Sequence, residues 1–370
     1  MAVLNQTAWQ GETDTMGAFS AAGAWPGVIA ELIAGHDLEP EVAAAALERM
    51  LEGTATDAQI AAFIVALRIK GETVEEVAGL VGAMLAVSSP LLLDDPEATL
   101  DIVGTGGSAA LAGKAFNVST MASLVAAAAG AVVCKHGNRK ASSTSGSTDL
   151  LEALGIAVEL DGDGVLSCVR SAGVGFAFAR VFHPSMRHVA PVRAQLGVPS
   201  VFNVLGPLSH PGRVGRQVIG VADPERMELI AQVLRRRGLT RAWVLHGEGG
   251  LDELTTTGST QVLELYQGEV RRFVVEPEQV GLPRVSIEQI RVGGPEENAA
   301  AARSILAAEP GPLRDMVVLN AAAGLVVADC ASDLAAGVEI AAAAIDDGRA
   351  AEVLNKLVVA SQEAAQSQSN

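Results

Sequence analysis

Apolar residues recur at helical spacing between residues 25 and 87 of the 370-residue chain. Four of them open the pattern on one helical face: Val28, Ile29, Leu32 and Ile33. Thr56 and Thr73 each precede a further apolar run, at a position where a threonine side chain caps a helix. The pattern predicts a small helical domain over residues 23–95, and the polar, aperiodic residues 1–22 are expected to form a disordered arm.

Beyond residue 95 the chain alternates between short apolar runs and helical stretches. Four runs are predicted to be buried strands: 100–103, 131–134, 216–221 and 242–246. Residues 224–237, between the last two runs, have helical periodicity, and this alternation is typical of a parallel sheet covered by helices. Residues 261–275 alternate about Gln267-Gly268 and indicate an antiparallel hairpin.

The expected fold class is therefore α/β, with a small N-terminal helical domain and a larger α/β domain that has a mainly parallel central sheet. The larger domain is predicted to span residues 96–362, followed by a tail over residues 363–370. A helix near residues 190–210 is expected to join the helical domain.

The composition of the chain opposes nucleic acid and membrane as binding partners. A formal net charge of −17 opposes binding to nucleic acid, because phosphate backbones attract basic surfaces. Residues 115–134 are uncharged over a membrane-spanning length, but their polar side chains favour a buried helix that runs into a strand. Cys134, Cys168 and Cys330 fit no zinc or disulfide pattern, and no signal-peptide pattern is present. These features predict a cytoplasmic protein that binds neither nucleic acid nor membrane.

The densest group of hydrogen-bond donors lies in residues 135–147. Two lysines, one arginine, five hydroxyl residues and two glycines fall within this segment. Cations supply charge, and glycines let backbone N–H groups approach an anion closely. In an otherwise acidic chain, this composition favours a binding site for a small phosphate-bearing ligand over a merely solvated loop.

A glycine turn, Gly104–Gly107, follows the first predicted strand, and ligands of parallel sheets gather at the carboxyl ends of strands. Residues 104–109 nearly fit the dinucleotide fingerprint of an NADP-dependent oxidoreductase, but no helix opens directly from the glycines. Residues 107–114 nearly fit a P-loop, but have one residue too many and lack the magnesium-binding hydroxyl at Ala115. The helix is predicted to start at Asn117–Thr120, where its dipole favours anions.

Five motifs in this order resemble the anthranilate phosphoribosyltransferase family: Gly104–Gly107, Asn117–Thr120, Lys135–Arg139, Gly146–Asp149 and Asp252–Glu253. The likeness extends over roughly residues 25–360. It implies transfer of the phosphoribosyl group from phosphoribosyl pyrophosphate (PRPP) to the amine of anthranilate, with release of pyrophosphate, in tryptophan biosynthesis. It also implies a helical domain on an α/β domain, Mg²⁺ as the cofactor, and a homodimer.

The same resemblance implies roles for individual residues. PRPP contacts are expected at Gly104, Gly107, Ser108, Asn117, Ser119, Thr120, Lys135, Asn138, Arg139, Ser142, Ser143 and Ser147. Anthranilate contacts are expected at His136, Asn138, Arg180 and Arg193. Arg193 matches the arginine that meets the substrate carboxylate, which a guanidinium grips with two hydrogen bonds.

The expected metal ligands are Ser119, Asp252 and Glu253, because Mg²⁺ prefers oxygen. Without the resemblance, an Asp-Glu pair reads equally well as a solvated turn. No residue is assigned as a catalytic base, since electrostatic stabilisation and positioning are expected to dominate the transfer.

The chain departs from the family pattern in the glycine loop. Ser108 stands where the family usually has aspartate, Ala115 where threonine or serine is common, and the segment 104–117 is a few residues longer. Arg180 replaces a common proline and adds a cation near the expected acceptor entrance. These departures leave open a paralogue that uses another aromatic acid or is weakly active. A non-catalytic paralogue and a pyrimidine phosphorylase are further alternatives.

Overall fold

The computed structural model describes residues 14–111, 113–138 and 146–369, and the chain forms two compact units. Within the described residues, unit 1 comprises residues 14–89, 183–210 and 232–238. Unit 2 comprises residues 90–182, 211–231 and 239–369, apart from the gaps at 112 and 139–145. The first segment of unit 1 thus ends before the expected domain boundary at residue 95.

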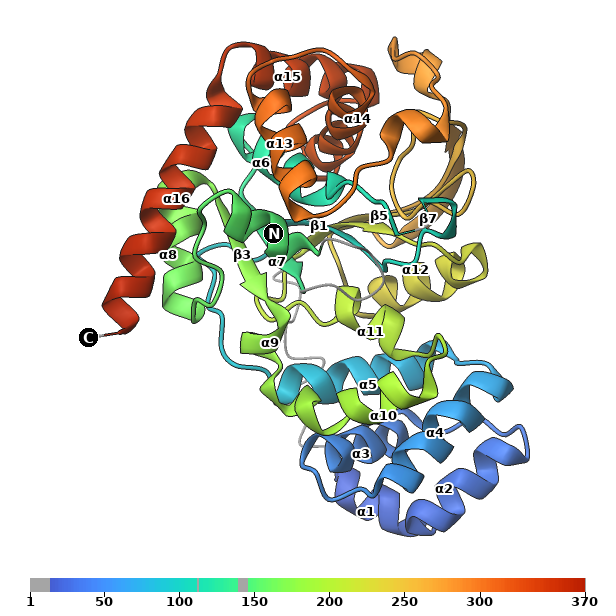
Figure 1. The fold of residues 1–370 in the computed structure, drawn as a ribbon. Coiled ribbons are helices and arrows are strands. Elements are labelled where there is room, and N and C mark those ends of the chain that lie inside the picture. Colours follow the sequence, from blue (N-terminus) through green and yellow to red (C-terminus); the bar gives the residue numbers. More distant parts are fainter. Residues whose placement is uncertain (1–13, 112, 139–145, 370) are drawn as a thin grey trace. The chain divides into compact units, whose positions relative to one another are not determined.

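Unit 1 is helical, and its N-terminal helices are blue in Figure 1. Its helices are α1 (Thr15–Ala21), α2 (Ala24–Ile33), α3 (Pro40–Leu51), α4 (Asp57–Lys70), α5 (Val74–Ala86), α10 (Ala190–Leu196) and α11 (Phe202–Leu208), with a 3₁₀ helix η3 (Pro184–His188). Thr56 and Thr73 form capping boxes at α4 and α5, as the sequence predicts. The buried carboxylate of Glu76 accepts the backbone N–H of Leu38 and the ammonium of Lys70.

The expectation of a disordered arm over residues 1–22 is wrong for its last part, because α1 lies within it. Asp14 caps this helix by accepting the N–H of Gly17. The ring of Phe19 is buried edge-to-face against Trp25, with 5.4 Å between the centroids. Tertiary contact between two aromatic rings therefore orders a segment that has too little periodicity to be predicted as a helix.

Unit 2 is built on a seven-stranded sheet with the order β3-β2-β1-β4-β5-β6-β7. Its strands are β1 (Leu100–Gly104), β2 (Val133–Gly137), β3 (Val174–Phe178), β4 (Arg216–Gly220), β5 (Arg241–Gly247), β6 (Thr260–Tyr266) and β7 (Glu269–Val275). The first five strands of this order run parallel, and β6 and β7 form the predicted antiparallel hairpin. Gln267 and Gly268 form its turn with positive φ angles of 51° and 80°. The mainly parallel sheet is thereby confirmed.

Helices cover this sheet. Those that begin in unit 2 are α6 (Val118–Ala128), α7 (Ser147–Ala153), α8 (Gly162–Ala172), α9 (Ala179–Phe182), α12 (Met227–Arg236), α13 (Pro295–Leu306), α14 (Pro312–Val327), α15 (Leu334–Asp346) and α16 (Arg349–Gln368). Short 3₁₀ helices are η2 (Ala109–Leu111), η4 (Pro224–Arg226), η5 (Pro277–Val280) and η6 (Ile287–Ile290). Figure 1 shows α13, α14 and α15 gathered with α6 on one side of the sheet. Gly324 lets α14 lie close to Ile102 of β1, because a Cβ at this position would overlap the Ile102 side chain.

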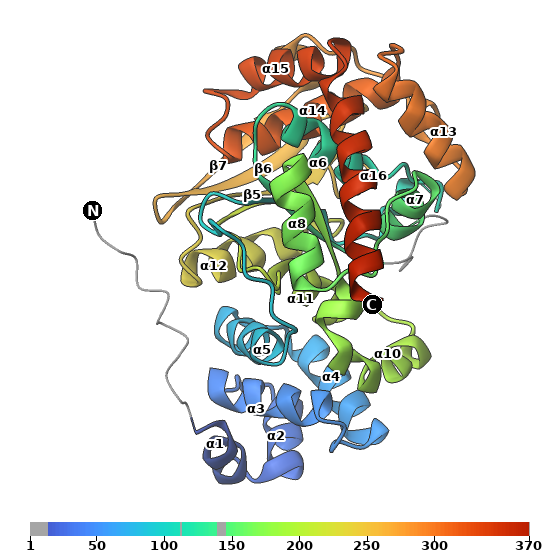
Figure 2. The same ribbon diagram turned by 90° about the vertical axis from the view of Figure 1, so that its left-hand side faces the viewer.

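The sequence predicts a tail over residues 363–370, but most of this segment is helical. Helix α16 continues to Gln368 and lies along α8, which Figure 2 shows lengthwise. A Cβ on Gly164 of α8 would meet Gln368 and Ala364, so the last turns of α16 pack against that helix.

No single helix of the described residues is long and apolar enough to cross a membrane. The bent pair α1 and α2 passes the same test of length and composition when the two helices are taken together. The uncharged run 115–134 contributes α6 and the start of β2, both buried, as predicted.

Candidate active site

Several of the expected ligand-binding residues of unit 2 lie at the carboxyl ends of the central strands. Gly104 ends β1 and is paired in register with Gly220, which ends β4. The segment after β5 folds back through a bridge between Gly247 and Leu251 and places Asp252 over both glycines. A Cβ on Gly104 would overlap the Asp252 carboxylate, and one on Gly220 would overlap its carbonyl oxygen. Glycine is therefore required at both strand ends by close approach.

The glycine turn holds the carboxylate of Asp252. The N–H of Gly106 donates to Asp252 Oδ2 at 2.7 Å, and the Ser108 hydroxyl donates to Asp252 Oδ1. The Asp252 N–H in turn lies 3.2 Å from Ser108 Oγ. Gly106 and Gly107 both have positive φ, at 71° and 95°, a conformation that suits glycine. Ser108, which stands where the resemblance implies an aspartate, thus orients the Asp252 carboxylate.

Glu253 lies against the start of α6. The N–H of Ser119 donates to its carboxylate, as suits a negative group at a helix N-terminus. Burial, and secondly the charge of Asp252, raise the pKa of Glu253 well above its usual range, although the residue as a whole keeps some exposure. The buried hydroxyl of Thr120 has no hydrogen-bond partner within the described part of the chain. The result is a group of two neighbouring carboxylates at the start of α6.

A buried charged pair lies beneath this group, between β1 and β2. These strands pair in register at Leu100 and Val133. Further along, hydrogen bonds from or to the side chains of Lys135 and Asp101 join the two strands. The Asp101 carboxylate accepts the N–H of His136 at 3.1 Å and the Gln217 amide at 3.2 Å. The Lys135 ammonium donates to the carbonyl of Ile102 in the same gap. Burial lowers the pKa of Lys135, and the charges of Asp101, Glu253 and Asp252 partly offset this effect.

We expect the stability of the wild type, measured relative to Asp101→Asn, to fall as pH rises from about 4 to about 6. Burial raises the pKa of Asp101 from 3.8 to about 6, so in this window the folded chain retains a proton that the unfolded chain has released. The contribution is complete below 3.8 and lost as pH passes the folded pKa, a change of about 3 kcal/mol. Urea unfolding across this window measures it, and parallel pH profiles for the two proteins would contradict it.

The described ends of the segment 135–147 belong to a strand and a helix. Lys135 and His136 are buried in β2, which extends further than the predicted run 131–134, and Asn138 is the first exposed residue after the strand. Ser147 begins α7, and its hydroxyl donates to the Asn138 carbonyl at 3.0 Å. Three of the expected PRPP contacts lie outside the described residues: Arg139, Ser142 and Ser143.

Two buried asparagines contact this site, and neither was predicted from the sequence. Asn298 of α13 accepts the N–H of Asn117, at the start of α6, and Asn320 of α14 accepts the N–H of Leu254, next to Glu253. Asn320 is a lone amide in an apolar helical stretch, which is a signal in the sequence that could have identified it, whereas Asn298 follows two glutamates and has no such signal. Asn117 occupies the N-cap position of α6. Its side chain makes no capping hydrogen bond to the helix, and its amide donates to Asn298 Oδ1 instead.

The two expected acceptor arginines belong to different units. Arg180 follows β3 in unit 2 and is exposed at the carboxyl edge of the sheet. Arg193 lies in α10 of unit 1, with its guanidinium 5.0 Å from the centroid of the Phe202 ring. Burial lowers the pKa of Arg193, and no carboxylate of the described residues forms an ion pair with it. A half-buried guanidinium of this kind can receive the carboxylate of a ligand.

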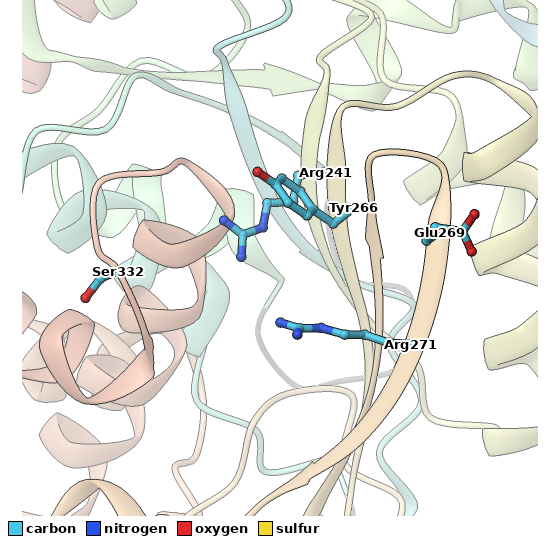
Figure 3. A pocket seen from close by; sticks show the side chains of 5 residues that line it. All are labelled: Arg241, Tyr266, Glu269, Arg271 and Ser332. Atoms are coloured by element: carbon cyan, nitrogen blue, oxygen red, sulfur yellow. The ribbon is translucent and has the colours of Figure 1, made fainter.

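A hollow of about 370 Å³ lies elsewhere on unit 2, lined by Arg241, Tyr266, Glu269, Arg271 and Ser332 (Figure 3). Arg241 begins β5, so this hollow is at the sheet edge opposite to Asp252. Its arginines are already engaged, because Arg241 and Arg271 both donate to the buried carboxylate of Glu264. The hollow therefore does not compete with the glycine turn as the candidate site.

The donor set suits Mg²⁺ rather than a metal held by protein alone. Nowhere in the described ranges do three His, Cys, Asp or Glu side chains converge to hold a metal ion. Asp252, Glu253 and the hydroxyls of Ser119 and Thr120 offer hard oxygen atoms. Burial, and secondly the charge of Asp252, raise the pKa of Glu253, so a cation bound there would stabilise its ionised form. Mg²⁺ is commonly bound by one or two carboxylates together with substrate phosphates and water. The residues present fit such an ion.

Comparison with known proteins extends over nearly the whole chain. Residues 96–351 match the a/b domain of a glycosyl transferase family, and residues 26–88 match the helical bundle domain of such a family. Anthranilate phosphoribosyltransferase of Methylocella silvestris is 47% identical over 337 residues, which are 91% of this chain and 95% of that protein. The crystal structure of the Thermus thermophilus enzyme of this name is 44% identical with a TM-score of 0.83, covering 90% of this chain and 99% of that chain.

More distant structures of the Saccharomyces cerevisiae enzyme contain ligands. One is in complex with PRPP and Mg, and is 27% identical with a TM-score of 0.79. Another is in complex with 4-fluoroanthranilate, and is 26% identical with a TM-score of 0.81. Both cover 95% of this chain and 99% of the yeast chain.

Proposed function

The chain belongs to the glycosyl transferase family that has a helical bundle domain and an a/b domain, and we propose that it joins anthranilate to PRPP. The phosphoribosyl group moves to the amine of anthranilate, giving N-(5-phosphoribosyl)anthranilate and pyrophosphate, in tryptophan biosynthesis. Relatives that carry this activity in their names match the chain over 90% or more of its length. The observation that carries the proposal is the Asp252–Glu253 pair, enclosed by the glycine turn and the start of α6.

We assign Ser119, Asp252 and Glu253 to Mg²⁺, which supplies positive charge to the departing pyrophosphate. Ser108 and Gly106 hold Asp252 in place, and the Ser119 N–H holds Glu253. These contacts fix both carboxylates before the substrate arrives, so little reorganisation accompanies the reaction.

PRPP is assigned to the carboxyl edge of β1 and β2. The proposed contacts are Gly104, Gly107, Ser108, Asn117, Ser119, Thr120, Lys135, Asn138, Arg139, Ser142, Ser143 and Ser147. The Lys135 ammonium is buried and donates to the Ile102 carbonyl, so its proposed contribution to PRPP binding is its positive charge, which also offsets the charge of the acidic pair. The ribose carbon of PRPP is strongly electrophilic once pyrophosphate leaves, so positioning of the amine is the main requirement on the acceptor side.

Anthranilate is assigned to His136, Asn138, Arg180 and Arg193. Arg193→Ala is expected to raise the KM for anthranilate about 10-fold or more while the KM for PRPP changes little, because the variant loses a charge-assisted contact to the carboxylate. Arg193→Lys retains the charge but cannot form the paired hydrogen bonds. Its KM for anthranilate should therefore lie between those of the wild type and Arg193→Ala. Steady-state kinetics with each substrate varied in turn measure the effect, and equal losses for both substrates would count against this role.

The function is tested by following the fluorescence of anthranilate in the presence of PRPP and Mg²⁺. We expect anthranilate to disappear in step with pyrophosphate release, and no consumption of anthranilate at any Mg²⁺ concentration would refute the proposal. A panel of substituted benzoates run beside it addresses the acceptor, since Arg180 and Ser108 depart from the family pattern. Faster turnover of another aromatic acid would identify a paralogue.

We further propose that the enzyme is a cytoplasmic homodimer. The three cysteines, Cys134, Cys168 and Cys330, are free thiols, which supports a reducing compartment. Large apolar side chains such as Ile33 and Ile69 are 75% and 81% exposed on unit 1, which supports an interface there. Light scattering of the purified chain tests the dimer.

A further inference from the structure

We propose that Asn320 is a positioning residue for the acidic pair: it clamps the backbone of Leu254 and thereby sets where Asp252 and Glu253 point. The inference rests on the proposed function, because its consequence is measured through PRPP and Mg²⁺. It concerns a residue of α14 that makes no assigned contact to substrate or metal.

The Asn320 side chain makes a paired contact with a single residue. Its Oδ1 accepts the Leu254 N–H at 3.0 Å, and its Nδ2 donates to the Leu254 carbonyl at 2.8 Å. The same Nδ2 donates to the carbonyl of Met316 one turn earlier in α14, at 2.9 Å. Three hydrogen bonds therefore define the orientation of the amide, and two of them define the orientation of the Leu254 backbone.

The backbone at Leu254 has no strand ladder to support it. Residues 252–259 lie between β5 and β6 outside the sheet, and Leu254 is fully buried. Buried N–H and C=O groups need partners, and here the Asn320 amide supplies both. Because Leu254 directly follows Glu253, the clamp limits rotation of the chain at the acidic pair.

The helix behind the clamp is buried and closely packed. Asn320 is the only polar residue among residues 316–327 of α14, every one of which is buried. Helix α14 lies close on β1 at Gly324, and β1 ends in the glycine turn that holds Asp252. Burial of a lone amide in an apolar helix is unfavourable unless it is hydrogen-bonded, so its presence is explained by the loop it holds.

Asn298 offers a matched comparison on the other half of the site. Its Oδ1 accepts the N–H and the side-chain amide of Asn117 at 3.0 and 3.1 Å, and its Nδ2 donates to the Gly293 carbonyl at 3.0 Å. It therefore supports the start of α6 rather than the backbone that follows Glu253. Both asparagines are buried, so replacing either by leucine removes a buried amide of the same kind.

The experiment measures PRPP binding to the full chain by calorimetry over a series of Mg²⁺ concentrations. Asn320→Leu should raise the Mg²⁺ concentration needed for half-maximal PRPP binding about 10-fold, as is usual when a partner that orients a metal ligand is lost. At saturating Mg²⁺ its dissociation constant for PRPP should return to the wild-type value. Asn298→Leu should weaken PRPP binding even at saturating Mg²⁺.

Two further variants separate positioning from folding. Ser361→Ala removes another buried contact between a side chain and the backbone, the bond from the Ala157 N–H, and should leave both quantities unchanged. Asn320→Ala provides a smaller replacement whose Mg²⁺ requirement should shift in the same direction as that of Asn320→Leu. Circular dichroism and thermal unfolding establish that each variant is folded.

The outcomes are distinct. An unchanged Mg²⁺ requirement in folded Asn320→Leu or Asn320→Ala would overturn the inference, as would a loss identical to that of Asn298→Leu. Failure of both Asn320 variants to fold would assign the residue to the core alone and also overturn it. Absence of PRPP binding to the wild type would instead refute the proposed function.

Discussion

The double variant Asp252→Asn, Glu253→Gln should lose phosphoribosyl transfer, with kcat lower by a factor of about 100 or more. Both substitutions keep the shape of the side chains but remove the charges that we assign to Mg²⁺. The same variant should be at least as stable as the wild type. Burial and the neighbouring charge raise the pKa of Glu253, so its ionised form disfavours the fold at neutral pH and a neutral amide does not.

This pairing of a large kinetic loss with retained stability is measured by turnover assays and urea unfolding of the same preparations. Glu269→Gln is the control, because Glu269 is an exposed carboxylate on the β6–β7 hairpin, at the far edge of the sheet, and should leave both quantities unchanged. Wild-type turnover in the double variant would remove the metal assignment. A large loss of stability would show that the pair supports the fold rather than the reaction.

Gly220→Ala should lower both the stability of unit 2 and the activity. The new Cβ would overlap the carbonyl of Asp252, which is backbone and cannot move aside as a flexible side chain can. Overpacking of this kind destabilises by about 3 kcal/mol, and displacement of the Asp252 backbone would also misplace its carboxylate. Urea unfolding and turnover of the variant measure the two effects.

Gly311→Ala is the matched control in the same unit. No heavy atom of the described structure lies within 4 Å of a Cβ at this position, and its φ of 162° is extended backbone that alanine adopts. Because it caps α14, a loss of less than about 1 kcal/mol is expected. Equal effects of the two substitutions would mean that close approach to Asp252 is not what requires glycine at residue 220.

Local features of the fold were predictable because they depend on neighbours in the chain. Thr56 and Thr73 cap their helices through residues three positions away, and Gln267-Gly268 closes a hairpin between adjacent strands. The motif residues Gly104 and Asp252 could likewise be selected from the chain, by their place after predicted strands and by resemblance.

The extent of β2 and the ordering of α1 could not be predicted in this way. Lys135 and His136 are polar, and their place inside a buried strand depends on contacts with β1: the Lys135 ammonium donates to the Ile102 carbonyl, and the His136 backbone N–H donates to the Asp101 carboxylate. Phe19 is helical because Trp25 covers it. Strand β3 was not predicted, because Val174–Phe178 is apolar throughout and shows no alternation that would separate it from a buried helix.

By itself, the sequence determined the class of fold, the helix caps, the hairpin and the identity of the acidic pair, since each depends on short-range pattern or on motif order. Tertiary structure decided what surrounds that pair. Gly106 and Asp252 are 146 positions apart, and Asn320 is 66 positions from Leu254, yet both contacts are direct hydrogen bonds. Contacts between such distant residues arise only when the sheet and its covering helices pack, because that packing brings buried polar groups to the partners they require.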